Sequence, residues 1–320
     1  MNLRFRCWIF FACALTGSLW AADGPLAPEE PRPSQSDTEL RGWLENMVWY
    51  HRFTPDEVSA ATGLNDAAVA TTLTRWQIRA DTRPKIPTNE VWLLPYPGGR
   101  HPRLGFFDGA IRTQRETKVS VFLPWPDSGY VVVDVPEAIF CNLGLIYLAH
   151  THVPTVWEAQ GITLPKREWM RTENSGWEST RTLPNGIAFG TLVTPIGRDA
   201  VAVRLWVRNG TEEPLTGMRA QVCAMLGRAV GFNGQTTANK LIEGSTVGVC
   251  NQDQRRWILS FWEPLNRAWE NPPVPCMHSD PAIPDCPPGE TREARGWLWF
   301  YEGADVRAEI RRRRDAWLAR

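Results

Sequence analysis

The chain has 320 residues, of which 43% are hydrophobic and 22% charged, and this length is enough for one large domain and a smaller one. Its formal net charge is zero, so the overall field favours neither nucleic acid nor an anionic membrane surface. Tryptophan is overrepresented with 17 residues, and its large flat ring suits both core packing and stacking on flat partners.

Residues 1–22 have the features of an export signal. A basic start precedes an apolar run from Cys7 to Leu19 that is too short to span a bilayer comfortably. No later segment is long and apolar enough to predict a membrane helix. We therefore expect an exported protein, periplasmic or extracellular, without an integral membrane segment. The proline-rich residues 23–37 predict a flexible tether after the signal.

Five cysteines remain after removal of the signal, and an oxidising compartment permits disulfides. They are Cys141, Cys223, Cys250, Cys276 and Cys286. Cys276 and Cys286 bracket one segment and form the best candidate pair, whereas Cys223 with Cys250 is the second candidate. Because five is an odd number, at least one thiol stays outside an intrachain disulfide. The spacing of the five is not that of a zinc ribbon.

Residues 38–80 predict a small module of three helices. Thr38 precedes the first helix as a capping residue. The second helix begins at Thr54, with Glu57 three residues later in the position of a capping box. Asn65 caps the third helix.

The spacing of these helices resembles a helix-turn-helix. DNA binding by such a unit requires a basic face. Residues 39–81 contain four arginines against six acidic residues, so the balance of charge is acidic. We therefore interpret the module as a structural or docking unit that does not bind nucleic acid, and the sequence does not identify its protein partner.

After a linker at residues 81–90, the pattern changes to period two over residues 91–302. In AVAVRLWV, residues 200–207, every second side chain is valine or leucine. Similar runs occur at residues 117–125, 129–136, 142–150, 186–195, 217–226, 255–262 and 293–301. About ten strands without intervening helices predict a mainly β protein with a large antiparallel β-sandwich. Residues 303–320 predict a C-terminal helix.

Four of the five histidines fall in three segments placed at or beyond predicted strand ends, where binding groups gather on a rigid scaffold. The polar candidates in these segments are Arg100, His101 and Arg103, then His150 and His152, then His278, Asp280 and Asp285. Residues 272–290 contain seven prolines, which predicts a long stiff loop, either functional or a cover over a sheet edge. Trp262 and Glu263 end an apolar strand just before that loop.

Two kinds of chemistry fit these residues. In the first, His152 or His150 and Glu263 act as general acid and base across a sugar ring, because histidine titrates near neutrality. Partial burial at the strand end would raise the pKa of Glu263. In the second, His150 and His152 bind a divalent metal together with His278. We favour the first, which requires no cofactor.

The order of these blocks resembles the galactose-mutarotase-like supersandwich, the fold of aldose 1-epimerases and several polysaccharide-acting enzymes. The matching motifs are Gly98-Gly99-Arg100, the segment with His150 and His152, Glu263-Pro264, Pro284-Asp285 and Pro288-Gly289-Glu290. The resemblance implies His152 or His150 as acid, Glu263 as base and Arg100 as a hydroxyl-binding group. The chain has HTHVPT where mutarotases have a His-Gly-Gly signature, so the resemblance implies the fold more than the mutarotase reaction. The chain also resembles exported bacterial proteins.

We therefore expect a glycan-binding protein with a concave β-sheet and an epimerase, lyase or hydrolase activity. The expected substrate-binding residues are Arg100, His101, Arg103, Trp262, His278, Asp280 and Asp285. One alternative is a non-catalytic glycan-binding or structural protein of the envelope, and another is a metal-dependent hydrolase that uses His150 and His152. An enzyme requires a histidine and a carboxylate that converge in a pocket, whereas a binder requires exposed Trp rings on a groove.

Overall fold

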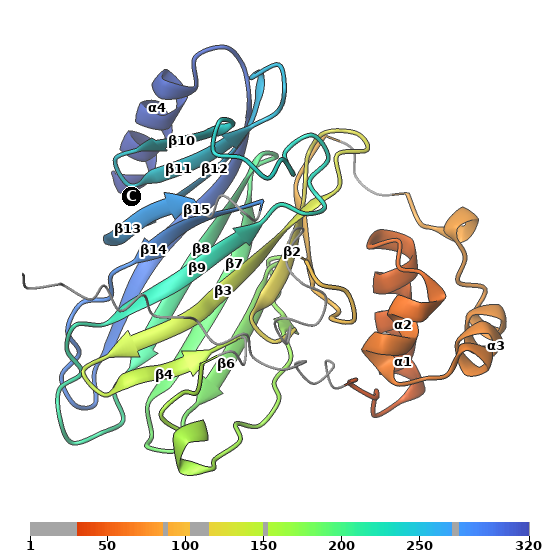
Figure 1. Cartoon of the computed structure of the whole chain (residues 1–320), viewed down its shortest axis with the longest axis horizontal. Coiled ribbons are helices and arrows are strands. Elements are labelled where there is room, and N and C mark those ends of the chain that lie inside the picture. Colours follow the sequence, from red (N-terminus) through yellow and green to blue (C-terminus); the bar gives the residue numbers. More distant parts are fainter. Residues whose placement is uncertain (1–30, 86–88, 103–114, 150–152, 271–274, 320) are drawn as a thin grey trace, which may run out of the picture.

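The computed structural model of the chain describes residues 31–85, 89–102, 115–149, 153–270 and 275–319. Its largest part consists of two open antiparallel sheets of seven and eight strands, and a small helical module lies beside them (Figure 1). The predicted mainly β fold with an antiparallel sandwich is therefore confirmed.

The helical module packs around an apolar core of its own. Its elements are α1 (Asp37–Glu45), the π-helix η1 (Asn46–Tyr50), α2 (Pro55–Thr62), α3 (Asp66–Trp76) and the short 3-10 helix η2 (Ala80–Thr82). The predicted capping box of α2 is confirmed, because the Thr54 hydroxyl accepts from the Glu57 amide and the Glu57 carboxylate accepts from the Thr54 amide. Asn65 caps α3 as predicted. The cap predicted at Thr38 is wrong, because the hydroxyl of Ser36 accepts the capping hydrogen bond two residues earlier.

The seven-stranded sheet has the order β1-β2-β3-β9-β14-β13, and β4 pairs with the far end of β3. Its strands are β1 (Trp92–Pro95), β2 (Lys118–Phe122), β3 (Tyr130–Cys141), β4 (Gly144–Leu148), β9 (Arg219–Met225), β13 (Leu265–Glu270) and β14 (Cys276–Pro281). Strand β14 lies inside the segment predicted as a stiff loop, so that prediction is wrong for these six residues. The polar and proline-rich pattern predicted a loop because the polar side chains of CMHSDP were expected to be exposed, whereas they are buried.

The eight-stranded sheet has the order β10-β11-β12-β15-β8-β7-β6-β5. Its strands are β5 (Met170–Arg171), β6 (Trp177–Thr182), β7 (Ala188–Ile196), β8 (Ala200–Arg208), β10 (Lys240–Glu243), β11 (Thr246–Cys250), β12 (Arg256–Glu263) and β15 (Thr291–Glu302); a short 3-10 helix, η3 (Glu158–Gln160), precedes β5. The alternation predicted for 200–207 is confirmed, since its valines and leucine are buried between the sheets. The predicted terminal helix is α4 (Val306–Leu318), whose Ile310 and Trp317 pack on the outer face of this sheet.

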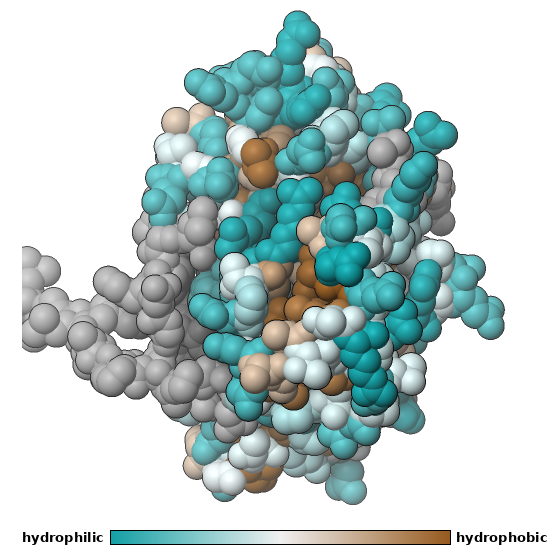
Figure 2. Space-filling view, turned by 90° about the vertical axis from the view of Figure 1, so that its right-hand side faces the viewer, coloured by the Kyte–Doolittle hydropathy of each residue, from teal (hydrophilic) through white to brown (hydrophobic). Residues whose placement is uncertain are grey.

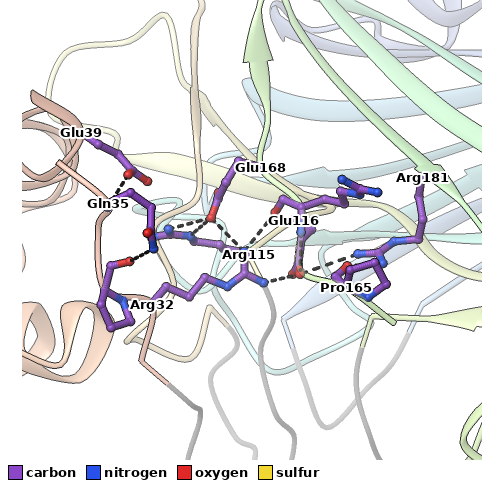
Figure 3. A network of polar contacts seen from close by, with 10 residues as sticks. Arg32, Gln35, Glu39, Arg115, Glu116, Pro165, Glu168 and Arg181 are labelled. Atoms are coloured by element: carbon purple, nitrogen blue, oxygen red, sulfur yellow. Dashed lines mark hydrogen bonds and ion pairs between the residues drawn. The ribbon is translucent and has the colours of Figure 1, made fainter. Parts of the chain in front are cut away.

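A network of ion pairs attaches the segment before α1 to the sandwich (Figure 3). Arg32 pairs with Glu116 and with Glu168, the latter at 2.9 Å, and Arg115 pairs with Glu168 at 2.7 Å. Arg181 of β6 lies 3.7 Å from Glu116 and donates to the backbone of Pro165. Burial alone would raise the pKa of Glu116, but the charges of Arg32 and Arg181 and the hydrogen bonds to the carboxylate together outweigh it and lower that pKa. These contacts make the network a structural joint.

The predicted disulfides are wrong, because none of the five cysteines of the described residues forms a disulfide, and all five are buried. Cys276 begins β14, where it pairs with Met225 of β9. Cys286 lies in the following loop, and its thiol donates to the carbonyl of Glu290 at 3.2 Å. No helix among the described residues is long and apolar enough to cross a membrane.

Candidate functional site

Arg100 joins the sheet to the helical module and is largely buried. Its guanidinium pairs with both carboxylate oxygens of Glu57 in α2. It also donates to the carbonyl oxygens of His51 and Arg52 and to the hydroxyl of Tyr130, at 2.9, 3.0 and 3.1 Å. Burial opposes ionisation of Glu57, but the hydrogen bonds from Arg100 lower the pKa of that carboxyl below its usual value. Arg100, predicted to bind a sugar hydroxyl, is therefore occupied by protein partners.

Of the other predicted site histidines and arginines, one lies next to the end of a described range and three lie outside the described residues. His101 follows Arg100 and is half-buried. Arg103, His150 and His152 lie outside the described residues. The predicted acid–base pair of these histidines with Glu263, and the predicted metal pair, therefore stay predictions.

Trp262 and Glu263 occupy opposite faces of β12. Trp262 is 2% exposed and lies between the sheets, with its ring directly against Gly296 of β15. This burial contradicts its predicted role in substrate binding. Glu263 is exposed at the end of β12, opposite Arg295. The prediction that Glu263 is partly buried is therefore wrong.

The structure brings two of the predicted residues, His278 and Asp280, together on one face of β14. The Nδ1 atom of His278 lies 3.8 Å from a carboxylate oxygen of Asp280, and the ring stacks on Trp269 with centroids 3.9 Å apart. The Asp280 carboxylate accepts hydrogen bonds from the Val222 amide at 2.9 Å and the Trp269 indole at 2.8 Å. Asp285 lies apart from them and accepts from the backbone of a neighbouring loop.

The surroundings of His278 favour a positive charge although the ring is buried. Burial alone would lower its pKa, but interactions with Cys223, Asp280 and Glu137 together outweigh this effect and raise the pKa to about 10. Glu137 contributes a carboxylate oxygen 3.8 Å from Nδ1. His278 thus occupies a buried position close to two carboxylates on the outer face of the seven-stranded sheet.

A cleft of about 410 Å³ opens between the helical module and the edge of the seven-stranded sheet. Its aromatic wall consists of Tyr50 at the end of η1, Trp92 of β1 and Phe122 of β2. The Trp92 and Phe122 rings stack with centroids 3.9 Å apart, and Tyr50 meets Trp92 edge-on at 4.8 Å. On the face that carries the helical module, apolar surface is visible in a depression bordered by hydrophilic residues (Figure 2).

The lining of the cleft carries an excess of positive charge. Arg52, Arg83 and Arg228 line it with exposed side chains. Asp127 is the one acidic residue among the described residues that line the cleft, and it is 93% exposed, 3.9 Å from Arg52. Because the chain as a whole has no net charge, this is a local feature of the cleft.

His51 lies behind the aromatic wall and serves as a fixed structural group. Its Nδ1 faces the carbonyl oxygen of Asn46 at 3.2 Å, so this nitrogen donates, and its Nε2 accepts from the Ser120 hydroxyl at 2.7 Å. Burial lowers the pKa of His51 to about 3, and the positive charge of Arg100 contributes in the same direction. The ring is therefore neutral and its two nitrogens are occupied.

The cleft could not be predicted from the sequence because its residues come from distant segments. Tyr50 belongs to the module, Trp92 follows the linker, and Arg228 follows β9. One local signal was available in PWPDSG, residues 124–129, the hairpin between β2 and β3. Trp125 lies there between two prolines, and its half-buried ring stacks on Phe232 at the margin of the core while it also lines the cleft.

Comparison with known proteins gives distant structural similarities. No family model matches the chain, and no curated protein matches its sequence. The Slr1438 protein from Synechocystis sp. PCC 6803 is similar with a TM-score of 0.33 and 8% identity, over 54% of this chain and 78% of that one. A putative kojibiose phosphorylase from the human microbiome has a TM-score of 0.35 and 10% identity, over 73% of this chain and 36% of that one.

Heparan sulfate lyase HepC from Pedobacter heparinus has a TM-score of 0.32 and 10% identity, over 88% of this chain and 45% of that one. The chain thus spans less than half of the phosphorylase and of the lyase. These scores and identities leave the activity to be inferred from the residues of the cleft itself.

Proposed function

We propose that the protein binds an acidic carbohydrate in the cleft between the helical module and the seven-stranded sheet. The observation that carries the proposal is the combination of an aromatic wall with three exposed arginines. Aromatic rings offer a flat apolar surface to the C–H face of a sugar. Guanidinium groups bind carboxylate and sulfate oxygens through paired hydrogen bonds.

The dimensions of the cleft fit such a ligand. Its volume of about 410 Å³ falls in the ordinary range of small-molecule sites, about 300–1,000 Å³. Trp92 is half-buried and lines the cleft, so part of its ring is accessible to a ligand. The arginines come from the module, the linker and the β9 loop, so the ligand would contact several segments at once.

Binding is better supported than catalysis by the described residues. The histidine nearest the cleft, His51, is neutral and hydrogen-bonded on both nitrogens. The carboxylate at the rim, Asp127, is exposed and paired with Arg52. An acid–base reaction by His152 or His150 with Glu263 remains the predicted alternative. Export of the protein through residues 1–22 also remains a prediction.

The test is calorimetric titration of the purified protein with an acidic oligosaccharide and with its neutral counterpart, in which the acidic groups are reduced or removed. We expect binding of the acidic form, weakened by added salt, and weaker or no binding of the neutral form. Arg228→Ala and Trp92→Ala should each weaken binding about tenfold or more, the loss of a single good contact.

The matched control for Arg228→Ala is Arg208→Ala. Arg208 is an exposed arginine at the end of β8, in the other sheet, and its loss changes the net charge equally. Equal weakening by both substitutions would mean a non-specific charge effect and would contradict the proposal. So would equal affinity for the acidic and neutral ligands.

A further inference from the structure

Two buried cysteines and a buried histidine converge on the outer face of the seven-stranded sheet. Cys223 lies on β9, directly opposite His278 of β14, and Cys276 lies two residues before that histidine on the same face. The two sulfur atoms and a ring nitrogen of His278 all lie within 4.8 Å of one another. We propose that Cys223, Cys276 and His278 bind one zinc ion.

The spacing of the three side chains suits a single ion. The Nε2 atom of His278 lies 3.7 Å from the sulfur of Cys276. Tetrahedral zinc with bonds of about 2.3 Å to sulfur and about 2.0 Å to nitrogen places such a pair about 3.5 Å apart. The ligand atoms therefore need only small adjustments to surround the ion.

The second ring nitrogen of His278 faces the kind of partner that zinc-binding histidines have. Nδ1 lies 3.8 Å from carboxylate oxygens of both Glu137 and Asp280. These separations are longer than a hydrogen bond. A small shift that brings one carboxylate to hydrogen-bond distance would fix the ring orientation and increase the basicity of the coordinating nitrogen. The Trp269 ring, stacked on the imidazole, restricts its rotation further.

The strand register argues against a disulfide between Cys223 and Cys276. The residue opposite Cys276 on β9 is Met225, so the two cysteines are diagonal rather than direct neighbours. Diagonal positions in an antiparallel pair are about 7–8 Å apart, beyond the usual Cα separation of a disulfide, about 4.4–6.8 Å. Two thiolates bound to one ion accommodate this separation without a shift of the strands.

The ligand set also selects the class of metal. Thiolate and imidazole ligands favour zinc over magnesium or calcium, which prefer oxygen. Three protein ligands leave a fourth position for water or another group, as in catalytic rather than structural zinc sites.

The experiment is metal analysis of the purified protein after loading with zinc and removal of excess by dialysis. We expect one zinc ion per chain. Replacement of zinc by cobalt(II) should give the intense near-ultraviolet absorption of cobalt–thiolate bonds, which does not depend on any enzymatic activity. Less than about one ion in ten chains, or a cobalt spectrum without thiolate absorption, would overturn the proposal, as would peptide mapping that shows a Cys223–Cys276 disulfide.

Variants localise the site. Cys276→Ser and His278→Gln should reduce the bound zinc to near zero, whereas Cys250→Ser, a buried cysteine packed under α4, should retain it. Glu137→Gln should keep the stoichiometry at saturation but weaken the affinity about 10- to 100-fold, measured by competition with a chelator. Retention of zinc in both Cys276→Ser and His278→Gln would refute the assignment, and the measurements on the unaltered protein decide the question if a variant does not fold.

Discussion

Replacement of Arg100 by methionine should destabilise the joint between the helical module and the sheet. The Arg100 side chain is only 9% exposed. Its guanidinium contacts the two carboxylate oxygens of Glu57, two backbone carbonyl oxygens and the Tyr130 hydroxyl. Arg100 also lies 4.1 Å from the centre of the Phe53 ring. Methionine retains much of the packing and removes the charge and the donors.

The size of the effect follows from the burial of the two partners. Removing one member of a buried ion pair costs about 3–5 kcal/mol, because the other charge is left without compensation. The side chain of Glu57 is 22% exposed, so water partly solvates it after the substitution. We therefore expect a loss near the lower end, about 3 kcal/mol of unfolding free energy.

Chemical denaturation followed by tryptophan fluorescence measures this loss. The double variant Glu57→Gln/Arg100→Met should lose less than the sum of the single variants, since it leaves no unpaired charge. Arg75→Ala is the control, because Arg75 and its partner Asp37 are both exposed and the pair contributes at most about 1 kcal/mol. A loss below about 1 kcal/mol for Arg100→Met, together with loss of ligand binding, would refute the structural role and favour the predicted role in hydroxyl binding.

Three further substitutions or conditions test the fold. The pKa of His51 falls from 6.5 to about 3 on folding, so the unfolded state binds the proton more tightly. The free energy of unfolding should therefore decrease as the pH falls below 6.5, by up to about 1.4 kcal/mol per pH unit. Chemical denaturation repeated across pH should show a smaller slope for His51→Asn. Thr54→Ala should cost about 1 kcal/mol through loss of the α2 cap, seen in urea denaturation. Gly296→Ala should lower the melting temperature, because the new Cβ lies 2.3 Å from the Trp262 ring, whereas Gly42→Ala in α1, with open space around it, should raise it slightly.

The fold was predictable where burial and local pattern agree. Strand β8 alternates apolar residues toward the core with Ala202, Arg204 and Trp206 on the other face, so period two identifies it. Strand β14 escaped prediction because its polar side chains, His278 and Asp280, are buried on the outer face of the sheet. A method based on hydrophobic pattern interprets such a segment as exposed, although here the buried polar residues belong to the candidate metal site.

The candidate sites were less predictable because they depend on strand order rather than on spacing in the chain. Cys223 and Cys276 are 53 positions apart and meet because β9 and β14 pair. Sequence spacing instead favoured Cys276 with Cys286, which lies beyond the end of the strand. Arg100 was recognised as important, but its partner Glu57 belongs to a helix 43 positions earlier, so its structural role was not visible.

The cleft and the cysteine–histidine cluster lie on the same face of the seven-stranded sheet and share one apolar cluster. That cluster extends from Phe122 through Val132 and Met225 to Cys276. Val132 and Met225 separate the two sites. Trp92→Ala should therefore weaken carbohydrate binding without loss of zinc, and Cys276→Ser should abolish zinc binding without weakening carbohydrate binding. If Cys276→Ser abolishes both while the fold is retained, the metal is part of the carbohydrate site, and its open coordination position would then face the ligand.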